Sequence, residues 1–578
     1  MKIAFTQFLG ANSDVSDELL QPNYAVEATN VFTDQGALST WKGLNSVGVS
    51  PVWNSTTGTL QSLFLMDNTR WLAFASEANT VFLQMAKNSD WQVAFTNTTL
   101  GPQYTSKSLA IAGGGTTYPV VFHKLGIEVP TTPLVATVTA KATPANSKKV
   151  SWSIAGTVSD TIGNRIARSY IYTFVNDSGR EGPPSAPSNL VYTNDDENVT
   201  LAGFQAVPQS DLTKIRIYVA ASGGTYNFLK ELTASTANYL VISNTFGAAI
   251  TTTLYSPPPV GLLGLVSMAN GMLAGYVGND VYFSEPYQSH AWPEDYIKSM
   301  DYPIKGLAAI GNMLYISTDG YPVIGTGNTP AFMSFSKLGA IPANYSSRSM
   351  VTMGVGFNST STMMNMGMSI MYASRDGIVL LTAGSAMMAS DGIISERVYQ
   401  QMNPSSIHAY FYRNKYVGFY DSGLSGSITA ETGEIIPAKG GFILDPMRKT
   451  VTYTDVYCQV AFSEKESGKL YLAIKQGDNT NKLYEWNEGS TNLTQAWKTK
   501  PVQTEPINFS VARVWAKRYP LTFQLYGDDA LVHTQTVTSQ EPFRLPSGYR
   551  SRKWAARITG DSYINGIFLA TSVKELIQ

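Results

Sequence analysis

The sequence predicts an all-β, multidomain protein: a β-propeller interrupted by an immunoglobulin/fibronectin-III-like sandwich and followed by a C-terminal β-sandwich. Three observations predict this class. Bulky side chains alternate with small ones in short segments, and pairs of such segments recur with Gly-Asn or Asp-Gly corners between them. No stretch shows the apolar period of a helix. The domain boundaries follow from changes in this pattern along the chain.

Residues 1–130 are predicted to contain an N-terminal arm and the first propeller blades. The segments from Ser62 to Gln84 and from Lys107 to His123 each contain paired apolar runs, and the second has a Gly-Gly-Gly corner that starts at Gly113. Such pairs are typical of antiparallel hairpins. We therefore expect the propeller to begin before the inserted domain and to continue after it.

Residues 131–258 are predicted to form the inserted sandwich. The most informative segment of the chain, RSYIYTFVNDSGREGPPSAPSN at Arg168–Asn189, carries rings at Tyr170, Tyr172 and Phe174. Their two-residue period predicts a strand with the rings on one face. An Asp-Ser-Gly turn follows, and the three prolines after it cannot donate to a central ladder. They predict an edge or a crossover between two sheets.

The flanks of this domain support an insertion. A second alternating strand from Ile215 to Val219 completes a unit of about the size of an immunoglobulin fold. Proline-rich stretches at Pro130–Pro133 and Pro257–Pro259 indicate stiff linkers on both sides. A propeller tolerates such an insertion where the chain leaves and returns at an exposed turn.

Residues 259–500 are predicted to form the remaining blades, because a two-strand unit recurs there at intervals of roughly 40 to 60 residues. The Asn-Gly and Asp-Gly pairs in these units predict hairpin corners with positive φ. The copies are MANGMLA at Met268–Ala274 with GNDVYFS at Gly278–Ser284, AIGNMLYI at Ala309–Ile316 with TDGYP at Thr318–Pro322, SIMYA at Ser369–Ala373 with RDGIV at Arg375–Val379, YFYRNKYVGF at Tyr410–Phe419, and KLYLA at Lys469–Ala473 with KLYEW at Lys482–Trp486.

Residues 501–578 are predicted to form the C-terminal sandwich, with alternating strands at Val511–Trp515 and Leu521–Leu525. The stretch from Arg544 to Arg557 has basic residues and no acidic one. These are Arg544, Arg550, Arg552, Lys553 and Arg557. They are candidates for a contact with phosphate or with an acidic neighbouring subunit. The alternative is that they occupy solvated outer positions of one strand.

The composition excludes several classes of protein. Lysine and arginine number 41 against 42 acidic residues, so no net field draws the protein to nucleic acid or to an anionic membrane. Cys458 is the only cysteine, which excludes an intrachain disulfide and a thiolate zinc site. The N-terminus does not resemble a secretory signal, and the most apolar stretch is too short to span a membrane. We expect a soluble protein made in a cytoplasm.

The motifs give no support for an enzyme, a cofactor or a metal site. There is no Gly-x-Ser-x-Gly elbow or Walker lysine loop, and the four histidines lack metal-ligand spacing; for His290 we expect a structural hydrogen bond. The Ser-Thr-Asp-Gly and Ser-Arg-Asp-Gly segments fail the sialidase Asp-box pattern, so we interpret them as hairpin corners. The pair Asp301 and Glu294 is set aside as an acid/base candidate. Because propellers also carry glycosidases, a propeller-based protein that binds or cleaves carbohydrate stays as the alternative function.

Five segments, in order along most of the chain, carry a family resemblance. They are LLQPNYAVEATNVFTDQGALSTWKG at Leu19–Gly43, KLGIEVPTTP at Lys124–Pro133, YTF with EGPPS in Tyr172–Ser185, YFSEPY with HAWP in Tyr282–Pro293, and EPFRLPSGYR at Glu541–Arg550. Together they resemble the tail nozzle of short-tailed bacteriophages (podoviruses), a family also called tail tubular protein B or DNA-stabilisation protein.

The resemblance implies a structural virion protein in the phage tail, assembled in the cytoplasm of the bacterial host. Members of that family form a hexameric ring below the portal and adaptor. The ring retains the packaged genome, gives it a channel for ejection without sequence specificity, and docks fibres or spikes; the host surface is a further contact. The low charge of this chain suits such a channel, because each lysine or arginine in its wall would bind passing phosphates.

Overall fold

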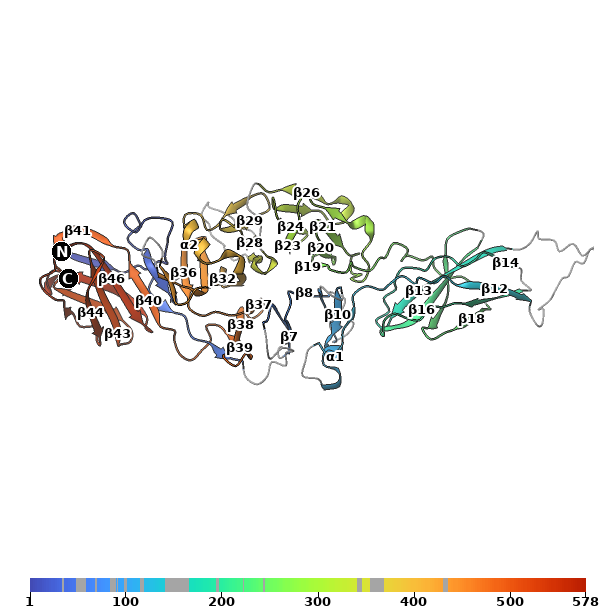
Figure 1. The fold of residues 1–578 in the computed structure, drawn as a ribbon, viewed down its shortest axis with the longest axis horizontal. Helices are drawn as coiled ribbons and strands as arrows, with labels where there is room; N and C mark the ends of the chain where they lie inside the picture. Colours follow the sequence, from blue (N-terminus) through green and yellow to red (C-terminus); the bar gives the residue numbers. More distant parts are fainter. Residues whose placement is uncertain are drawn as a thin grey trace, which may run out of the picture.

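The computed structural model describes residues 1–577 except 34–35, 48–58, 68–69, 84–89, 91, 98–100, 115–118, 141–165, 194–196, 222, 243–244, 340–345, 354–367 and 430–434. The described chain is almost entirely β. Figure 1 shows three parts in a row: a sandwich with both chain ends, a propeller, and the inserted domain at the far end. The predicted fold class is confirmed. None of the helices in these residues is long and apolar enough to span a membrane.

Seven sheets form a closed ring in the described part of the chain. Their inner strands β6, β8, β19, β23, β27, β31 and β37 follow one another around the ring. The sheets are β6 (Ser62–Asp67) and β7 (Arg70–Phe74); β8 (Thr80–Phe82), β9 (Gln92–Phe95), β10 (Gln103–Ser106) and β11 (His123–Lys124); β19 (Leu263–Ser267), β20 (Leu273–Val277), β21 (Asp280–Phe283) and β22 (Lys298–Ser299); β23 (Ile304–Ile310), β24 (Met313–Thr318), β25 (Val323–Thr326) and β26 (Ser334–Lys337); β27 (Val351–Met353), β28 (Ser369–Ala373), β29 (Ile378–Leu381) and β30 (Ala386–Met388); β31 (His408–Tyr412), β32 (Lys415–Asp421), β35 (Lys439–Asp445) and β36 (Thr450–Thr454); and β37 (Val460–Glu464), β38 (Lys469–Lys475), β39 (Asn481–Glu485) and β5 (Asn45–Ser46).

The ring closes through strands that are distant in sequence. β5, from the N-terminal arm, pairs with β39 of the last blade, with Ser46 opposite Tyr484. A propeller sheet that combines the two ends of the chain cannot open without breaking this ladder. The predicted hairpin at Lys107–His123 is wrong: helix α1 (Lys107–Ala110), capped by the Ser106 hydroxyl that accepts from the Leu109 N–H, and a 3-10 turn at Ala112–Gly114 occupy its first half. Within the two segments predicted as hairpins, residues 68–69, 84 and 115–118 lie outside the described residues.

The hairpin corners use glycine for two different reasons. Gly271, in the Asn-Gly pair, has φ of 81°, as predicted. The prediction is wrong for the Asp-Gly pairs at Gly320 and Gly377, which are not left-handed. A Cβ atom on Gly320 would lie 2.4 Å from Cδ2 of Tyr302, so glycine is required there because the tyrosine ring lies against the backbone.

The inserted domain is a sandwich of two sheets. One sheet contains β12 (Val135–Ala140), β15 (Glu197–Ala202) and β18 (Asn238–Val241); the other contains β14 (Val191–Thr193), β13 (Ile166–Asn176), β16 (Leu212–Ala221) and β17 (Asn227–Thr233). The rings of Tyr170, Tyr172 and Phe174 are fully buried between the sheets, as their alternation predicts. The proline segment leads into β14, which is an edge strand.

The C-terminal sandwich also contains the N-terminal arm. One sheet orders β1, β47, β42 and β45; in the other, β2, β40, β46, β43 and β44 continue the β31–β36 blade, and β41 pairs with β46. The strands are β1 (Lys2–Phe5), β2 (Ala25–Thr29), β40 (Gln495–Thr499), β41 (Val502–Ile507), β42 (Val511–Ala516), β43 (Leu521–Gly527), β44 (Ala530–Val537), β45 (Phe543–Arg544), β46 (Ser551–Gly560) and β47 (Ile564–Ala570). The sandwich therefore extends beyond residues 501–578, because pairing between the chain ends has no local sequence signal.

The remaining elements are short. They are the strands β3 (Val31–Phe32), β4 (Ser39–Thr40), β33 (Ser427–Thr429) and β34 (Ile435–Pro437), the helices α1 (Lys107–Ala110), α2 (Glu396–Gln401) and α3 (Lys574–Ile577), and single 3-10 turns.

Strand β2 joins the propeller to the sandwich. It pairs in parallel with β36 of the propeller and antiparallel with β40 of the sandwich, so one sheet runs through both parts. On β2, the buried carboxylate of Glu27 accepts two hydrogen bonds from Arg557 of β46, at 2.6 and 2.8 Å. This bond raises the pKa of Arg557. The two chain ends are thus joined by a bidentate ion pair as well as by a ladder.

We expect Glu27→Gln to destabilise the sandwich by about 3 kcal/mol, because it leaves Arg557 without its counter-ion in a largely buried place. The free energy of unfolding from urea titration measures this. The matched control is Lys553→Gln, which removes an ion pair to Asp529, an exposed side chain. This variant should lose less than about 1 kcal/mol of its free energy of unfolding. Equal losses in the two variants would contradict the structural role of Glu27.

Candidate functional site

The linkers of the inserted domain lie side by side and form a neck, which we define by residues 125–127, 176–182 and 257–259 with the propeller side chains that contact them. A Cβ atom on Gly126 would lie 2.4 Å from Cδ of Pro258, so the outgoing linker packs directly on the incoming one. A Cβ atom on Gly182 would lie 2.4 Å from Cγ2 of Ile127. The neck is therefore close-packed at two glycines, and a larger residue at either position would push the packed segments apart.

Arg180 forms the centre of the neck. Its Nη2 atom donates to Oε1 of Gln92 in the propeller at 2.6 Å, and its guanidinium lies 5.2 Å from the centre of the Tyr104 ring. The Tyr104 hydroxyl donates to Asp211 of the inserted domain at 2.9 Å and accepts from Asn176 at 3.3 Å. Burial lowers the pKa of Arg180, while the charges of Tyr104, Asp177 and Asp211 raise it. These hydrogen bonds and the contact between the guanidinium and the ring hold the inserted domain against the propeller.

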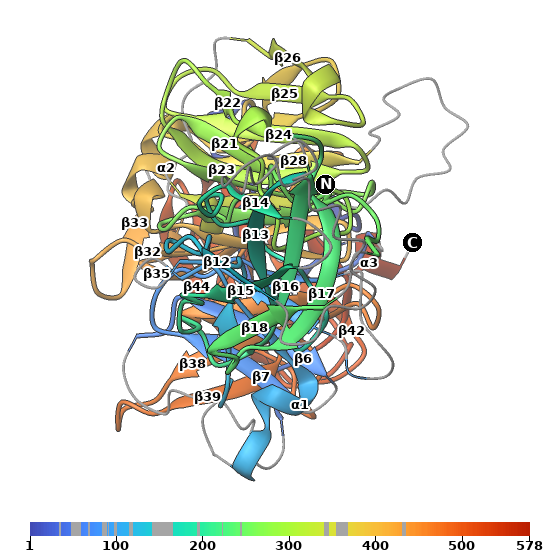
Figure 2. The same ribbon diagram turned by 90° about the vertical axis from the view of Figure 1, so that its right-hand side faces the viewer.

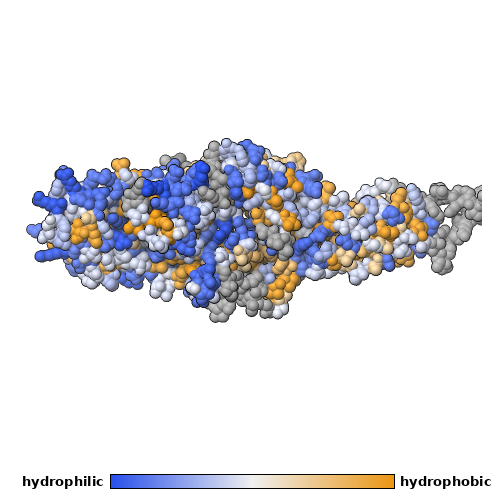
Figure 3. All heavy atoms as spheres, in the orientation of Figure 1, coloured by the Kyte–Doolittle hydropathy of each residue, from blue (hydrophilic) through white to orange (hydrophobic). Residues whose placement is uncertain are grey.

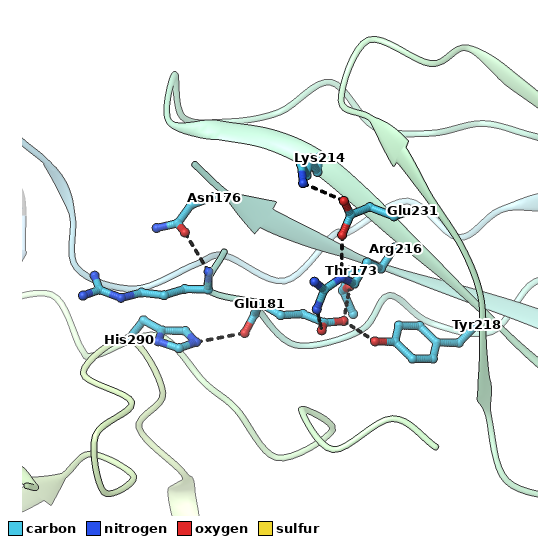
Figure 4. Close-up of polar contacts among 9 residues, drawn as sticks. Thr173, Asn176, Glu181, Lys214, Arg216, Tyr218, Glu231 and His290 are labelled. Carbon is cyan, nitrogen blue, oxygen red and sulfur yellow. Dashed lines mark hydrogen bonds and ion pairs between the residues drawn. The ribbon is translucent and has the colours of Figure 1, made fainter. Parts of the chain in front are cut away.

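The carboxylate of Glu181 anchors the same turn to the inserted domain (Figure 4). It accepts hydrogen bonds from Thr173 at 2.6 Å, from Tyr218 at 2.6 Å and from Arg216 at 2.7 Å. Arg216 also donates to Glu231, which accepts a further bond from Lys214. All the partners of this carboxylate belong to the β13–β16–β17 surface, so the turn cannot move without the sheet.

His290 joins this turn to the propeller. Its Nε2–H donates to the carbonyl oxygen of Glu181 at 3.0 Å, which Figure 4 shows at the lower left of the network. The ring is 3% exposed and packs edge-on to Tyr255. Burial, with the nearby charge of Arg180, lowers the pKa of His290 to about 4. The predicted structural hydrogen bond of this histidine is confirmed.

Three of the five sequence segments that carry the family resemblance meet at the neck. Ile127 comes from KLGIEVPTTP, Glu181 and Gly182 from EGPPS, and His290 from HAWP. Sequence analysis identified the segments but not their contact, and it missed Arg180 and Asp211. Arginine beside a turn gives no sign of burial, because its partners are far away in sequence.

The structure separates the five basic residues of the predicted contact. Arg557 is paired with Glu27, and Lys553 lies 3.1 Å from Asp529 and within 3.7 Å of Glu18. Arg544, Arg550 and Arg552 are exposed, and we find no ion pair for their side chains within the described residues. The predicted subunit or phosphate contact therefore stays a prediction for these three arginines.

Side chains from several parts of the propeller meet around Arg348. Arg348 donates to the carbonyl oxygen of Gln459 at 2.7 Å. Burial raises the pKa of Tyr410 of β31, and the charge of Arg348 lowers it. Burial raises the pKa of Glu77, and the charge of Arg348 lowers it. Burial, with the nearby Glu77 carboxylate, raises the pKa of Tyr276.

The other sequence candidates do not form a reactive cluster. The Asp301 carboxylate forms an ion pair with the Lys337 ammonium at 2.6 Å. Cys458 is buried, and burial raises the pKa of its thiol. No group of three or more histidine, cysteine or acidic residues within the described residues could hold a metal ion.

Comparison with known proteins adds little to this description. A scan against protein-family models and a search of curated proteins find no match. Solved structures that match include an exo-β-1,3-galactanase from Phanerochaete chrysosporium, at 7% identity over 69% of this chain and 100% of that chain with a TM-score of 0.21. PorZ, a surface component of the type-IX secretion system of Porphyromonas gingivalis, matches at 9% identity over 84% of this chain and 63% of that chain with a TM-score of 0.25. The WD40 domain of SCAP from fission yeast matches at 9% identity over 89% of this chain and 82% of that chain, with a TM-score of 0.16.

We expect the neck to weaken in acid. Because the pKa of His290 falls from 6.5 to about 4 on folding, its contribution to stability is complete above pH 6.5 and is lost as the pH falls toward 4. His290→Gln retains an N–H donor but does not titrate. Between about pH 7 and about pH 4 the wild type should therefore lose about 3 kcal/mol more of its free energy of unfolding than the variant. Parallel curves for the two proteins, measured by urea titration at each pH, would contradict this role.

Proposed function

We propose that this chain is a structural, non-catalytic subunit of the tail nozzle of a short-tailed phage. Identical copies would form a ring, retain packaged DNA and provide the channel for its ejection, with docking surfaces for the tail adaptor and for fibres or spikes. The observation that carries the proposal is the neck: three of the five segments of the family resemblance converge on an architectural joint between two domains.

The proposed channel would lie between copies of the chain that stand side by side in the ring. The near balance of 41 basic and 42 acidic residues suits a wall that binds passing phosphates weakly.

The outer face of the three-stranded sheet in the inserted domain suits a contact with another protein. Its outward positions carry no charge: they are Val135, Thr137, Thr139, Asn198, Thr200, Ala202, Asn238, Leu240 and Ile242. Ile242 is 81% exposed and Leu240 is 45% exposed. Figure 3 shows hydrophobic side chains on the surface of the inserted domain. An uncharged face with exposed aliphatic groups is more often a site of protein contact than a surface that stays in water.

The assembly state tests the proposal. We expect native mass spectrometry of the purified chain to show closed multimers of identical copies, with six as the number that the family resemblance implies. Arg180→Met, which loosens the neck, should reduce ring formation while the monomer stays folded by circular dichroism. A strictly monomeric species at every concentration, together with hydrolysis of a glycan, would overturn the proposal.

The three exposed arginines give a separate prediction. Replacing Arg544, Arg550 and Arg552 with serine should lower the fraction of assembled ring or virion by at least about tenfold without changing the melting temperature, because their side chains have no ion pair in the described chain. Lys553→Ser is the matched control, since its ammonium already has partners within the chain. Normal assembly of the triple variant would return these residues to the solvated-surface interpretation.

A propeller that binds or cleaves carbohydrate is the second candidate. Several of the matched structures are of glycan-acting enzymes, with TM-scores near 0.2, and this likeness alone favours the alternative. Cleavage of the common kind requires two carboxylates about 5 to 10 Å apart. A measurement of glycan hydrolysis by the purified chain would distinguish cleavage from binding within this candidate.

A further inference from the structure

A pocket opens between the outer strands of two neighbouring blades. It encloses about 230 Å³ between the end of β22 and strands β25 and β26, which lie near the upper edge of the propeller in Figure 2. Its walls carry three aromatic rings, from Tyr302, Tyr321 and Phe335. Tyr302 and Tyr321 are 41% and 38% exposed. Both tyrosine side chains are therefore accessible to a ligand in the pocket.

These rings are held in position before any ligand arrives. The Tyr302 ring lies against the backbone of Gly320, where a Cβ atom would be only 2.4 Å away. Its centre is 6.0 Å from that of Tyr321, with the planes at 80°. The turn that carries Tyr321 is fixed by Thr318, whose hydroxyl donates to the Tyr321 carbonyl at 2.7 Å and accepts from the Gly320 N–H at 3.0 Å. A fixed ring binds a ligand with little loss of side-chain freedom.

Charged groups of both signs surround the rings. The Asp301 carboxylate and the Lys337 ammonium form an exposed pair at 2.6 Å, and Lys337 also lies 5.8 Å from the centre of the Tyr321 ring. Lys298 adds a second ammonium to the lining. The rim therefore offers both acceptors and donors for adjacent hydroxyl groups, and its lining carries one more positive than negative charge.

We propose that this pocket binds a single sugar ring, with a preference for an acidic sugar. The C–H faces of a pyranose pack on exposed aromatic rings, and its hydroxyls need donors and acceptors at close range. The volume is below the roughly 300 Å³ at which pockets for drug-sized ligands begin, so it suits one ring and not a chain of several. A proline-rich peptide would need an extended groove with parallel aromatic ridges. The extra ammonium favours a carboxylated ring.

The inference deepens the carbohydrate-binding candidate and does not depend on ring assembly, because every lining residue belongs to one chain. A sugar site on the outer edge of a propeller is also compatible with a nozzle subunit that touches a glycan-covered host surface. Binding and assembly are measured separately, so either can fail without the other.

Glucuronic acid and glucose form a matched ligand pair, since they differ in one carboxylate. We expect saturation-transfer NMR on the full chain to detect both at about millimolar affinity, with glucuronic acid binding more tightly. Tyr302→Ala and Tyr321→Ala should each weaken both sugars by about tenfold. Lys298→Gln should reduce the preference for glucuronic acid and leave glucose binding unchanged.

Tyr287→Ala is the control, because Tyr287 is also exposed and also lies against a glycine, Gly271, but does not line the pocket. It should bind both sugars like the wild type. Melting temperatures establish that each variant is folded, and Tyr302→Phe, which retains the ring, should restore binding. No saturation transfer to either sugar, equal binding by Tyr302→Ala and the wild type, or capture of a proline-rich peptide in place of the sugars would overturn the proposal.

Discussion

The pairing of the two chain ends is the constraint on which the rest of the structure depends. β2 lies between a propeller strand and a sandwich strand, and β5 completes the last blade. One hydrophobic core then extends from the blades into the sandwich. Contacts this distant in sequence bring a large loss of chain entropy, so they form only when the intervening blades are in place. Propeller and sandwich therefore behave as one unit.

The inserted domain is joined to the propeller by a different kind of contact. Its own core is separate from that of the propeller, and the neck uses buried polar groups instead of a shared apolar interface. A buried arginine such as Arg180 adds little stability, because removal of its charge from water offsets most of its attraction to its partners. What it adds is a single permitted orientation, since a displaced domain would leave the guanidinium and Asp211 without partners.

This distinction bears on function. A domain attached only through flexible linkers would sample many directions, whereas the neck gives the uncharged face of the insert one direction relative to the propeller. Fixed directions matter in an assembly of identical copies, where a small angular error at each subunit prevents closure. The tyrosine pocket is lined by other residues, between Lys298 and Lys337, so the two surfaces can serve different partners.

The sequence by itself determined the parts that local chemistry controls. The alternation at Tyr170, Tyr172 and Phe174 required a strand with a buried face, the recurring hairpins required a propeller, and the prolines required an edge strand. Only the tertiary structure decided which distant groups meet: Glu27 with Arg557, His290 with Glu181, and Tyr302 with Gly320. Periodicity reports which face of a segment is apolar. It carries no information about which side chain on another strand or blade a residue will contact, and those partners determined the neck, the joined chain ends and the pocket.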